Sequence, residues 1–296
     1  MPARVVRGVP LTRPYVPPAR DAVIRIGSPL LAVEVGNTRA KFGWFPPVLL
    51  TQSPGSSSPP VPRAVARVPH GGDVADAVRA VLPEDEGDRP ETVLAGVDAA
   101  AAAAVWNAWP TGLCPPPRML TPRDLAGRVE NVTRTPETTG VDRLLNALAA
   151  AALFPDAPAV AVADCGTATT VDRVLPRDRG VDVGAVFAGG AILPGPTLAA
   201  AALTDRTALL PAVDLTGGPA DGLDTPSAIR RGVLTSHAAG VDRLFSHIRE
   251  AHPAAACVLT GGAAPLTVPH LQTPDVRVVE HLTLTGLALA ARAGTA

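Results

Sequence analysis

Lysine is almost absent from this sequence. Lys41 is the only lysine, although lysine and arginine together number 26. The bias toward alanine, proline and arginine is typical of a GC-rich coding background, which replaces lysine by arginine wherever either serves. A lysine that persists under this bias is a candidate for a position that needs a compact point charge, and chance survival is the alternative. Lys41 is therefore the first candidate functional residue.

The 296 residues also include few cysteines and no long apolar run, and their net charge is small. Three widely spaced cysteines provide neither a disulfide framework nor a metal-binding pattern, which favours a reducing cytoplasm. A net charge of -1 argues against a nucleic-acid partner, and no apolar stretch reaches the roughly 18 residues of a membrane span. No His-Glu-x-x-His motif and no serine-centred nucleophile motif occurs. These absences predict a soluble, cytoplasmic protein without a nucleic-acid or membrane partner.

The hydrophobic fraction of 47% supplies enough apolar material for two cores. Residues 1–28 are rich in arginine and proline and lack the apolar segment of a signal peptide, so we expect a disordered extension or a start codon assigned too early. From residue 29 on, strands alternate with helices, which predicts the α/β class, with domains over 29–145 and 146–296. The pattern predicts helices over Val74–Val81, Ala99–Trp109, Val141–Leu153, Leu198–Leu203, Thr225–Ile248 and Leu282–Arg292.

Two strand-turn segments of the chain resemble each other. Each has an apolar strand, a carboxylate, any residue, a glycine and then a hydroxyl within two positions: Glu34, Gly36 and Thr38 in the first, Asp164, Gly166 and Thr167 in the second. A duplicated domain with a shared cleft is the simplest explanation, although strand-Asp-x-Gly turns are common.

The first of these turns has the residue types that bind a polyphosphate. A glycine after a strand lets backbone N–H groups approach phosphate oxygens. Asn37 and Thr38 add donors, Lys41 can reach a phosphate as a point charge, and Glu34 can hold Mg²⁺ directly or through water. An ordinary β-turn with capping polar groups is the alternative.

The second turn and one helix start offer further candidates. Asp164 and Thr167 repeat the arrangement of the first turn, while Cys165 between them is expected to be a small buried hydrophobic residue. At the start of the helix predicted over Val141–Leu153, Asp142 either complements the helix dipole or accepts a hydroxyl proton. Arg143 can pair with a substrate carboxylate, since a helix N-terminus favours anions.

Other motifs are read as structural. The second Gly-Val-Asp-Arg, at Gly240 to Arg243, is interpreted as a chance copy on a solvated helix face. The pair Gly189-Gly190 predicts a turn, or a flat surface for an adenine base. His237, His247 and His252 are expected at the surface or at a helix end.

These motifs, in this order, resemble the type III pantothenate kinases, which belong to the superfamily of acetate and sugar kinases, actin and the heat-shock ATPases. The resemblance covers nearly all of the chain from about residue 30 to the C-terminal helix, and it is specific as a combination rather than in any one piece. The matching segments are Glu34 to Lys41, Gly140 to Arg143, Asp164 to Thr170, Gly189 to Leu210, Thr225 to Gly232 and Leu259 to Gly262.

The resemblance implies an α/β fold of two ribonuclease-H-like, actin-like ATPase domains with an interdomain cleft, usually in a homodimer. It implies a pantothenate kinase, a phosphotransferase that acts on an alcohol group. The reaction would be ATP-dependent phosphorylation of pantothenate to 4'-phosphopantothenate, the first step of coenzyme A biosynthesis. Mg²⁺ and a monovalent cation, K⁺ or NH₄⁺, would take part.

The resemblance also implies a role for each matching residue. ATP binding would fall on Glu34, Val35, Gly36, Asn37, Thr38, Arg39, Ala40, Lys41 and Thr167. Pantothenate binding would fall on Gly140, Val141, Asp142, Arg143 and Thr225, with Asp142 as the catalytic proton acceptor. Asp164 would help bind the monovalent cation, and Glu34 is a candidate to hold Mg²⁺ through water.

Glu34 departs from the family, which usually has aspartate at this position. The extra methylene moves the carboxylate by roughly a bond length, and misplacement by about 1 Å can cost on the order of 100-fold in rate. A water-bridged Mg²⁺ can absorb the shift, so we expect a retained, slower kinase. The alternatives are a weak or inactive relative that regulates by binding pantothenate or nucleotide, and a kinase of another small hydroxy compound. A pure interaction module would not need carboxylates at both turns.

Overall fold

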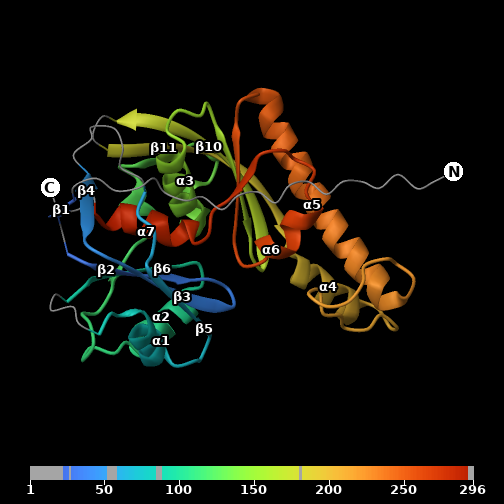
Figure 1. Ribbon diagram of the computed structural model, residues 1–296, viewed down its shortest axis with the longest axis horizontal. Helices are drawn as coiled ribbons and strands as arrows, with labels where there is room; N and C mark the ends of the chain where they lie inside the picture. The colour runs from blue at the N-terminus through green and yellow to red at the C-terminus, as the bar shows by residue number, and fades with distance from the viewer. Residues whose placement is uncertain (1–22, 27, 52–58, 85–88, 180–181, 293–296) are drawn as a thin grey trace.

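A computed structural model describes residues 23–26, 28–51, 59–84, 89–179 and 182–292. Its elements form two larger sheets, a small two-stranded sheet and seven α-helices within these ranges (Figure 1). The helices are α1 (Val74–Val81), α2 (Ala99–Asn107), α3 (Val141–Leu153), α4 (Pro196–Arg206), α5 (Thr225–Ala251), α6 (Ala264–Thr267) and α7 (Leu282–Arg292). Short 3-10 turns span Pro122–Leu125, Pro136–Thr138 and Val268–His270.

The first large sheet comes from the N-terminal half of the chain. Its strand order is β5 (Ala64–Pro69), β3 (Arg39–Phe45), β2 (Leu30–Val35), β6 (Glu91–Gly96) and β7 (Arg118–Met119). In this sheet β3 is antiparallel to both of its neighbours, β2 and β5, whereas β6 lies parallel to β2 and β7 parallel to β6. When these five strands are numbered by their order along the chain, their order across the sheet is third, second, first, fourth, fifth.

The second large sheet repeats this arrangement and adds one strand. Its order is β13 (Val276–Val278), β12 (Ala256–Thr260), β9 (Val160–Cys165), β10 (Ala168–Arg179), β11 (Asp182–Pro194) and β8 (Val129–Asn131). The pairs β9–β10 and β10–β11 are antiparallel, while β12 is parallel to β9 and β13 to β12. Both halves thus have the strand order of a ribonuclease-H-like domain, which confirms the predicted fold class.

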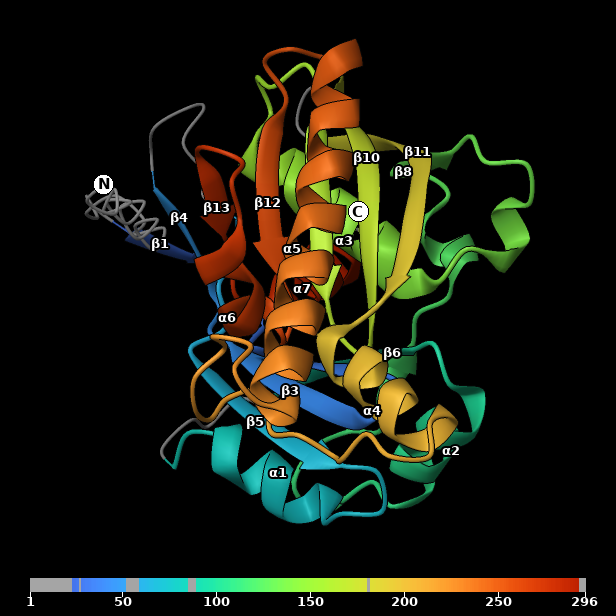
Figure 2. The same cartoon turned by 90° about the vertical axis from the view of Figure 1, so that its right-hand side faces the viewer.

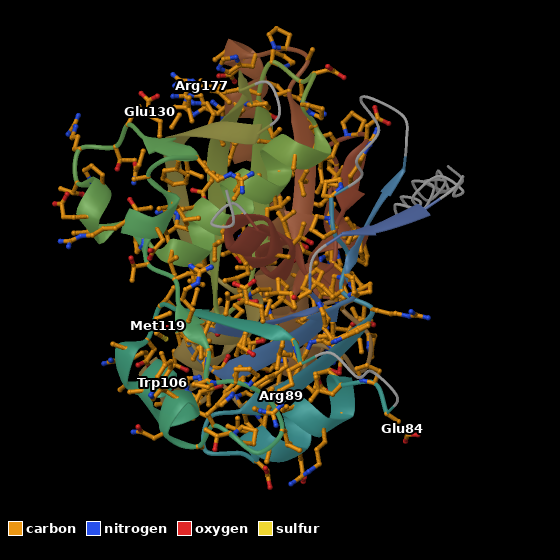
Figure 3. All side chains as sticks on the ribbon, turned by 90° about the vertical axis from the view of Figure 1, so that its left-hand side faces the viewer. Glu84, Arg89, Trp106, Met119, Glu130 and Arg177 are labelled. Carbon is orange, nitrogen blue, oxygen red and sulfur yellow. The ribbon has the colours of Figure 1, made fainter. Side chains whose placement is uncertain are left out.

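The added strand β8 lies at the edge of the second sheet, parallel to β11. Arg177 of β10 forms an ion pair with Glu130 of β8, and both side chains are 45% exposed at the surface (Figure 3). Exposed ion pairs contribute about 0–1 kcal/mol. The attachment of β8 therefore depends mainly on its backbone pairing and on Val129, which is buried.

Five layers follow from the apolar clusters. Helices α1 and α2 cover the outer face of the first sheet, and α5 and α6 cover the outer face of the second (Figure 2). Helices α3 and α7 lie between the two sheets, where their side chains join those of β2, β6 and β9 in the largest core (Figure 1). Ala147, Ala149, Ala150 and Ala151 of α3 are buried, because this helix is enclosed on both sides.

Several elements have the bounds that the periodicity predicts, namely α1, α3 and α7. Ordered structure begins before residue 29, because β1 (Val23–Ile26) pairs with β4 (Val48–Thr51). Residues 1–22 lie outside the described residues. The domain boundary at 145 stays a prediction: β8 joins the second sheet, and α7 packs against β2 of the first.

Candidate active site at the junction of the two sheets

Three strands of the first sheet present charged side chains side by side. Glu34 of β2 is directly opposite Lys41 of β3, and Lys41 is opposite Arg67 of β5. Paired residues of adjacent strands point to the same face. Lys41 Nζ donates to Glu34 Oε2 at 2.9 Å, and the two side chains are 20% and 12% exposed. The single lysine therefore lies in a half-buried ion pair beside the first turn.

The first glycine turn is closed by its own backbone. Gly36 N donates to the carbonyl oxygen of Arg39 at 3.0 Å. Asn37 and Thr38 are exposed at its tip, and His70 Nε2 lies 2.9 Å from the carbonyl oxygen of Gly36. The turn thus presents polar groups outward, with His70 as a neighbour that sequence reasoning did not find.

The second glycine turn meets the first. Gly166 N donates to the carbonyl oxygen of Ala168 at 3.1 Å, which closes a similar turn after β9. The hydroxyl oxygens of Thr38 and Thr167 are 3.3 Å apart, although 129 residues separate them. The structure therefore brings the two predicted turns together at one junction between the sheets.

The start of α3 brings a third carboxylate to this junction. Gly140 is the N-cap of α3, and Asp142 Oδ1 accepts a hydrogen bond from the backbone N–H of Arg143 at 2.8 Å. A Cβ at Gly140 would lie 2.4 Å from Asp142 Oδ1, so glycine leaves room for the carboxylate in this orientation. Glu34, Asp142 and Asp164, called the junction carboxylates below, act on one another electrostatically.

Two of the junction carboxylates, Asp142 and Glu34, have a raised pKa. Burial, and then the negative charges of Asp164 and Glu34, raise the pKa of Asp142 to about 6. Burial also raises the pKa of Glu34, against the opposing effect of Lys41. Desolvation and like charges both disfavour the ionised form. A carboxylate whose pKa lies near neutrality is suited to accept a proton and to release it again.

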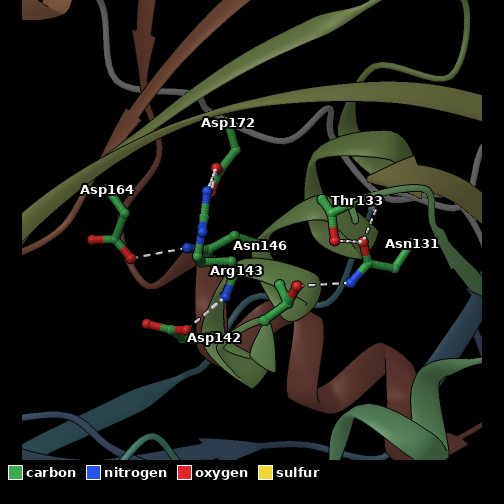
Figure 4. A network of polar contacts seen from close by, with 8 residues as sticks. Asn131, Thr133, Asp142, Arg143, Asn146, Asp164 and Asp172 are labelled. Atoms are coloured by element: carbon green, nitrogen blue, oxygen red, sulfur yellow. Dashed lines mark hydrogen bonds and ion pairs between the residues drawn. The ribbon is translucent and has the colours of Figure 1, made fainter. Parts of the chain in front are cut away.

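Arg143 is held by a partner within the chain (Figure 4). Its Nε donates to both oxygens of Asp172 at 3.1 Å, and its Nη2 donates to Oδ1 of the same carboxylate. Its guanidinium also lies 5.1 Å from the centre of the Phe187 ring. Nη1 has no such partner among the described residues, so a bond from Arg143 to a substrate carboxylate stays a prediction that would use this group.

The pair Gly189-Gly190 contributes to this arrangement, and it is not a turn. It lies within β11 at an irregular register, where Gly190 is opposite Asp172. A Cβ on Gly190 would lie 2.2 Å from the carbonyl oxygen of Val171 and 2.4 Å from Asp172 Oδ1. The missing side chain therefore leaves space for the Asp172 carboxylate that binds Arg143.

Thr225 lies in a groove that none of the junction carboxylates lines. It is the first residue of α5 and lines this groove of about 780 Å³ between α4, α5 and the segment that joins them. The apolar residues that line the groove include Ala199, Leu203, Leu210, Leu223, Ile229 and Val233. The predicted contact between Thr225 and pantothenate remains untested by this geometry.

Two interpretations from the sequence were wrong. His237 is 6% exposed, not at the surface; its Nε2 lies 2.8 Å from Thr169 Oγ1 and its Nδ1 3.2 Å from Thr267 Oγ1. Asp242 is not on a purely solvated face, because it accepts hydrogen bonds from the backbone N–H groups of Gln272 and Thr273. Each contact joins residues about 30 or more apart in sequence, so no local pattern predicted it.

Cys165 is fully buried, as expected, and burial raises its pKa to about 12. A thiol that stays protonated is a poor nucleophile. The described residues include no cluster of three His, Cys, Asp or Glu side chains able to form a metal cage. They also include no helix whose length and apolarity would let it cross a membrane.

The strand order, repeated in both halves, and the two turns that meet at the junction carboxylates define a protein of the actin-like ATPase and kinase class. Residues 30–247 match the family model of type III pantothenate kinases, which is most of the chain. The chain therefore belongs to the type III pantothenate kinase family.

Individual relatives agree with this assignment. The chain is 41% identical over 166 residues to a type III pantothenate kinase of Herminiimonas arsenicoxydans, a match that spans 61% of that relative's length. It is 32% identical over 284 residues to one of Cupriavidus taiwanensis, with 88% of this chain and 97% of the relative covered. Among solved structures, a glucokinase from Streptomyces griseus has a TM-score of 0.48 at 13% identity, with 90% of this chain and 100% of that chain covered.

Proposed function

We propose that this chain transfers the γ-phosphate of ATP to the primary hydroxyl of pantothenate, the first step of coenzyme A biosynthesis. The observation that carries the proposal is the meeting of both glycine turns beside Asp142, with the hydroxyls of Thr38 and Thr167 3.3 Å apart. Family membership supports the choice of substrate. The product would be 4'-phosphopantothenate.

The roles of the residues follow from the chemistry of phosphoryl transfer, which needs positioning and charge stabilisation more than covalent catalysis. Backbone and hydroxyl groups of the two turns would hold the phosphates, and Lys41 would neutralise part of their charge. Asp142, with a pKa near 6, would accept the proton of the attacking hydroxyl. Pantothenate would bind at Gly140 to Arg143, beside this base.

The carboxylates present fit Mg²⁺ held in the manner typical of kinases. Mg²⁺ prefers one or two carboxylates together with phosphates and retained waters, rather than a closed protein cage. Glu34 supplies such oxygens for Mg²⁺, and the absence of a three-ligand cluster among the described residues agrees with an open site. When bound, the ion would offset charge on the phosphates. We assign Asp164 to a monovalent cation, K⁺ or NH₄⁺, and Glu34 to water-bridged Mg²⁺.

A coupled ADP-release assay with ATP, Mg²⁺ and pantothenate, with and without K⁺, tests the proposal. We expect ADP formation that depends on pantothenate, rises with K⁺ and is lost in Asp142→Asn. A panel of other small hydroxy compounds should give slower turnover. Failure to form ADP while a non-hydrolysable ATP analogue still binds would instead support a regulator, the alternative that Glu34 favours.

We further propose a cytoplasmic homodimer. The groove beside α4 and α5 supports the oligomeric proposal, because Leu223 at its edge is 87% exposed and neighbouring Leu209 is 91% exposed. Exposed contiguous apolar surface commonly marks an interaction site. The two-fold symmetry of most homodimers would place the same groove on both sides of the interface.

A further inference from the structure

One buried polar side chain behind the junction has no role in the mechanism above. Asn146 of α3 is 2% exposed, and its Nδ2 donates to Asp164 Oδ2 at 2.8 Å (Figure 4). Its Oδ1 accepts a hydrogen bond from Thr283 Oγ1 of α7 at 3.0 Å. Asn146 therefore links α3, β9 and α7 directly behind one of the junction carboxylates.

The hydrogen bonds fix the orientation of the Asn146 amide. An ionised carboxylate can only accept, so the NH₂ group must face Asp164 and the carbonyl oxygen must face the Thr283 hydroxyl. Turning the amide would leave buried groups unpaired, which costs about 1–3 kcal/mol for each. Thr283 is 3% exposed, so water does not readily replace it.

Only one oxygen of Asp164 is occupied by this contact. The other, Oδ1, lies against Gly261 at the end of β12, where an added Cβ would be 2.5 Å away. Gly261 has a φ of 93°, in the left-handed region that favours glycine. Asn146 holds Oδ2 of Asp164, and Gly261 has no side chain that would cover Oδ1. The oxygen Oδ1 is therefore held in one orientation in which a ligand can reach it.

We infer that Asn146 is a positioning residue that fixes Asp164 relative to Asp142. The two residues of α3, Asp142 and Asn146, are four positions apart and so lie on one face of the helix, one turn from each other. The helix thereby carries both the base and the amide that orients the second carboxylate. This inference rests on the proposed function, in which both carboxylates act on one phosphoryl transfer.

Two variants distinguish the effect of the Asn146 amide from that of the Thr283 hydroxyl that supports it. Asn146→Leu removes both hydrogen bonds with little change in volume, and Thr283→Val removes only the hydroxyl. Because misplacement by about 1 Å can cost on the order of 100-fold, we expect Asn146→Leu to lower kcat by roughly that factor. The KM for pantothenate should stay within about twofold of wild type, since the buried Asn146 lies outside the proposed pantothenate site at Gly140 to Arg143. Thr283→Val should lower kcat by a smaller factor.

A buried apolar variant on the same helix controls for lost stability. Leu148 is fully buried in the core, so Leu148→Ala should lower the unfolding temperature and leave kcat per folded molecule near that of wild type. An equal fall in kcat for Leu148→Ala and Asn146→Leu would show a merely structural effect and overturn the inference.

A double-mutant cycle with Asp164→Ala, which removes both acceptor oxygens, gives the decisive result. If Asn146 acts through Asp164, then Asn146→Leu should change the residual kcat of Asp164→Ala by less than about twofold, because the hydrogen bond between the two side chains is already gone. Two results overturn the inference. One is a fall in kcat, when Asn146→Leu is added to the Asp164 variant, as large as the fall that Asn146→Leu causes in wild type. The other is a wild-type kcat in Asn146→Leu alone. Wild-type protein that forms no ADP with pantothenate would instead overturn the proposed function, before any variant is compared.

Discussion

At the scale of single residues, the site places several negatively charged side chains in surroundings that disfavour their charge. Asp142 and Glu34 are both largely buried, and the negative charge of Asp164 adds to the effect of burial in raising the pKa of each. Lys41 relieves this repulsion with one hydrogen bond of 2.9 Å to Glu34. Arg67, opposite Lys41 in the sheet, adds a second positive charge that also acts on Glu34.

The pKa of Asp142, about 6, predicts the acid limb of the activity profile. A general base must be ionised, so kcat/KM for pantothenate should fall about tenfold per pH unit below pH 6 and level off above it. The measurement is initial rate against pH from 5 to 8. A profile that is flat down to pH 5 would contradict the assignment of Asp142 as the base in the free enzyme.

The same raised pKa predicts the effect of Asp142 on stability. The folded protein binds this proton more tightly than the unfolded chain, so the contribution to stability is present below the ordinary pKa of 3.8 and is lost as pH rises through about 6. Asp142→Asn should therefore abolish turnover yet unfold at a higher temperature than wild type at pH 7. A lower unfolding temperature at pH 7 would show that the carboxylate stabilises the fold.

The role of the Glu34 carboxylate, at a position where the family usually has aspartate, can be tested by substitution. Because a water-bridged Mg²⁺ can absorb the extra methylene, Glu34→Asp should keep kcat within about tenfold of wild type. Glu34→Gln keeps the size and removes the charge, and should lower kcat by about 100-fold. Steady-state kinetics at saturating ATP and Mg²⁺ decide the matter, and a wild-type rate in Glu34→Gln would rule out a role for this charge.

At the scale of elements, the position of the site depends on the contact between α3 and α7. Gly286 of α7 crosses α3 so closely that an added Cβ would lie 2.2 Å from the carbonyl oxygen of Leu145. The same crossing places Thr283 against Asn146. Small residues at the crossing thus determine how the C-terminal helix supports the junction carboxylates.

This close crossing predicts a large effect for a single methyl group. Gly286→Ala must push backbone apart, and overpacking of this kind costs about 1–3 kcal/mol or more. We expect a lower unfolding temperature and a reduced kcat, because α7 would carry Thr283 away from Asn146. Gly112→Ala is the matched control, since a Cβ there meets no atom within 4 Å. Equal stability of the two variants in thermal unfolding would contradict the close packing.

At the scale of the whole molecule, the groove beside α4 and α5 is a broad apolar surface of the second half. If it forms the homodimer interface, Leu223→Glu should convert a dimer into a folded monomer, because burying an unpaired charge is costly. Light scattering after size-exclusion chromatography measures the mass. Val61→Glu is the control on the first half, where Val61 is also exposed, at 55%. A wild-type monomer, or an unchanged mass in Leu223→Glu, would exclude this interface.

Local patterns predicted much of the fold. The apolar spacing on α1, α3 and α7 gave the observed bounds, since each helix packs along the faces that its period creates. The edge strand β8 was not predicted, because its three residues carry little periodicity and its partner β11 lies more than 50 residues later. The bulge at Gly190 was read as a turn, since a glycine pair does not distinguish the two.

The sequence by itself determined the α/β class, the two glycine turns with their carboxylates, and the likeness to the type III pantothenate kinases. These depend on short-range order along the chain, which a pattern records directly. Only the tertiary structure decided which side chains surround the carboxylates. Asn146 reaches Asp164 across 18 residues, Arg143 reaches Asp172 across 29, and Thr283 reaches Asn146 across 137. Contacts of that kind arise when two sheets close around α3 and α7, and a linear pattern carries no signal for them.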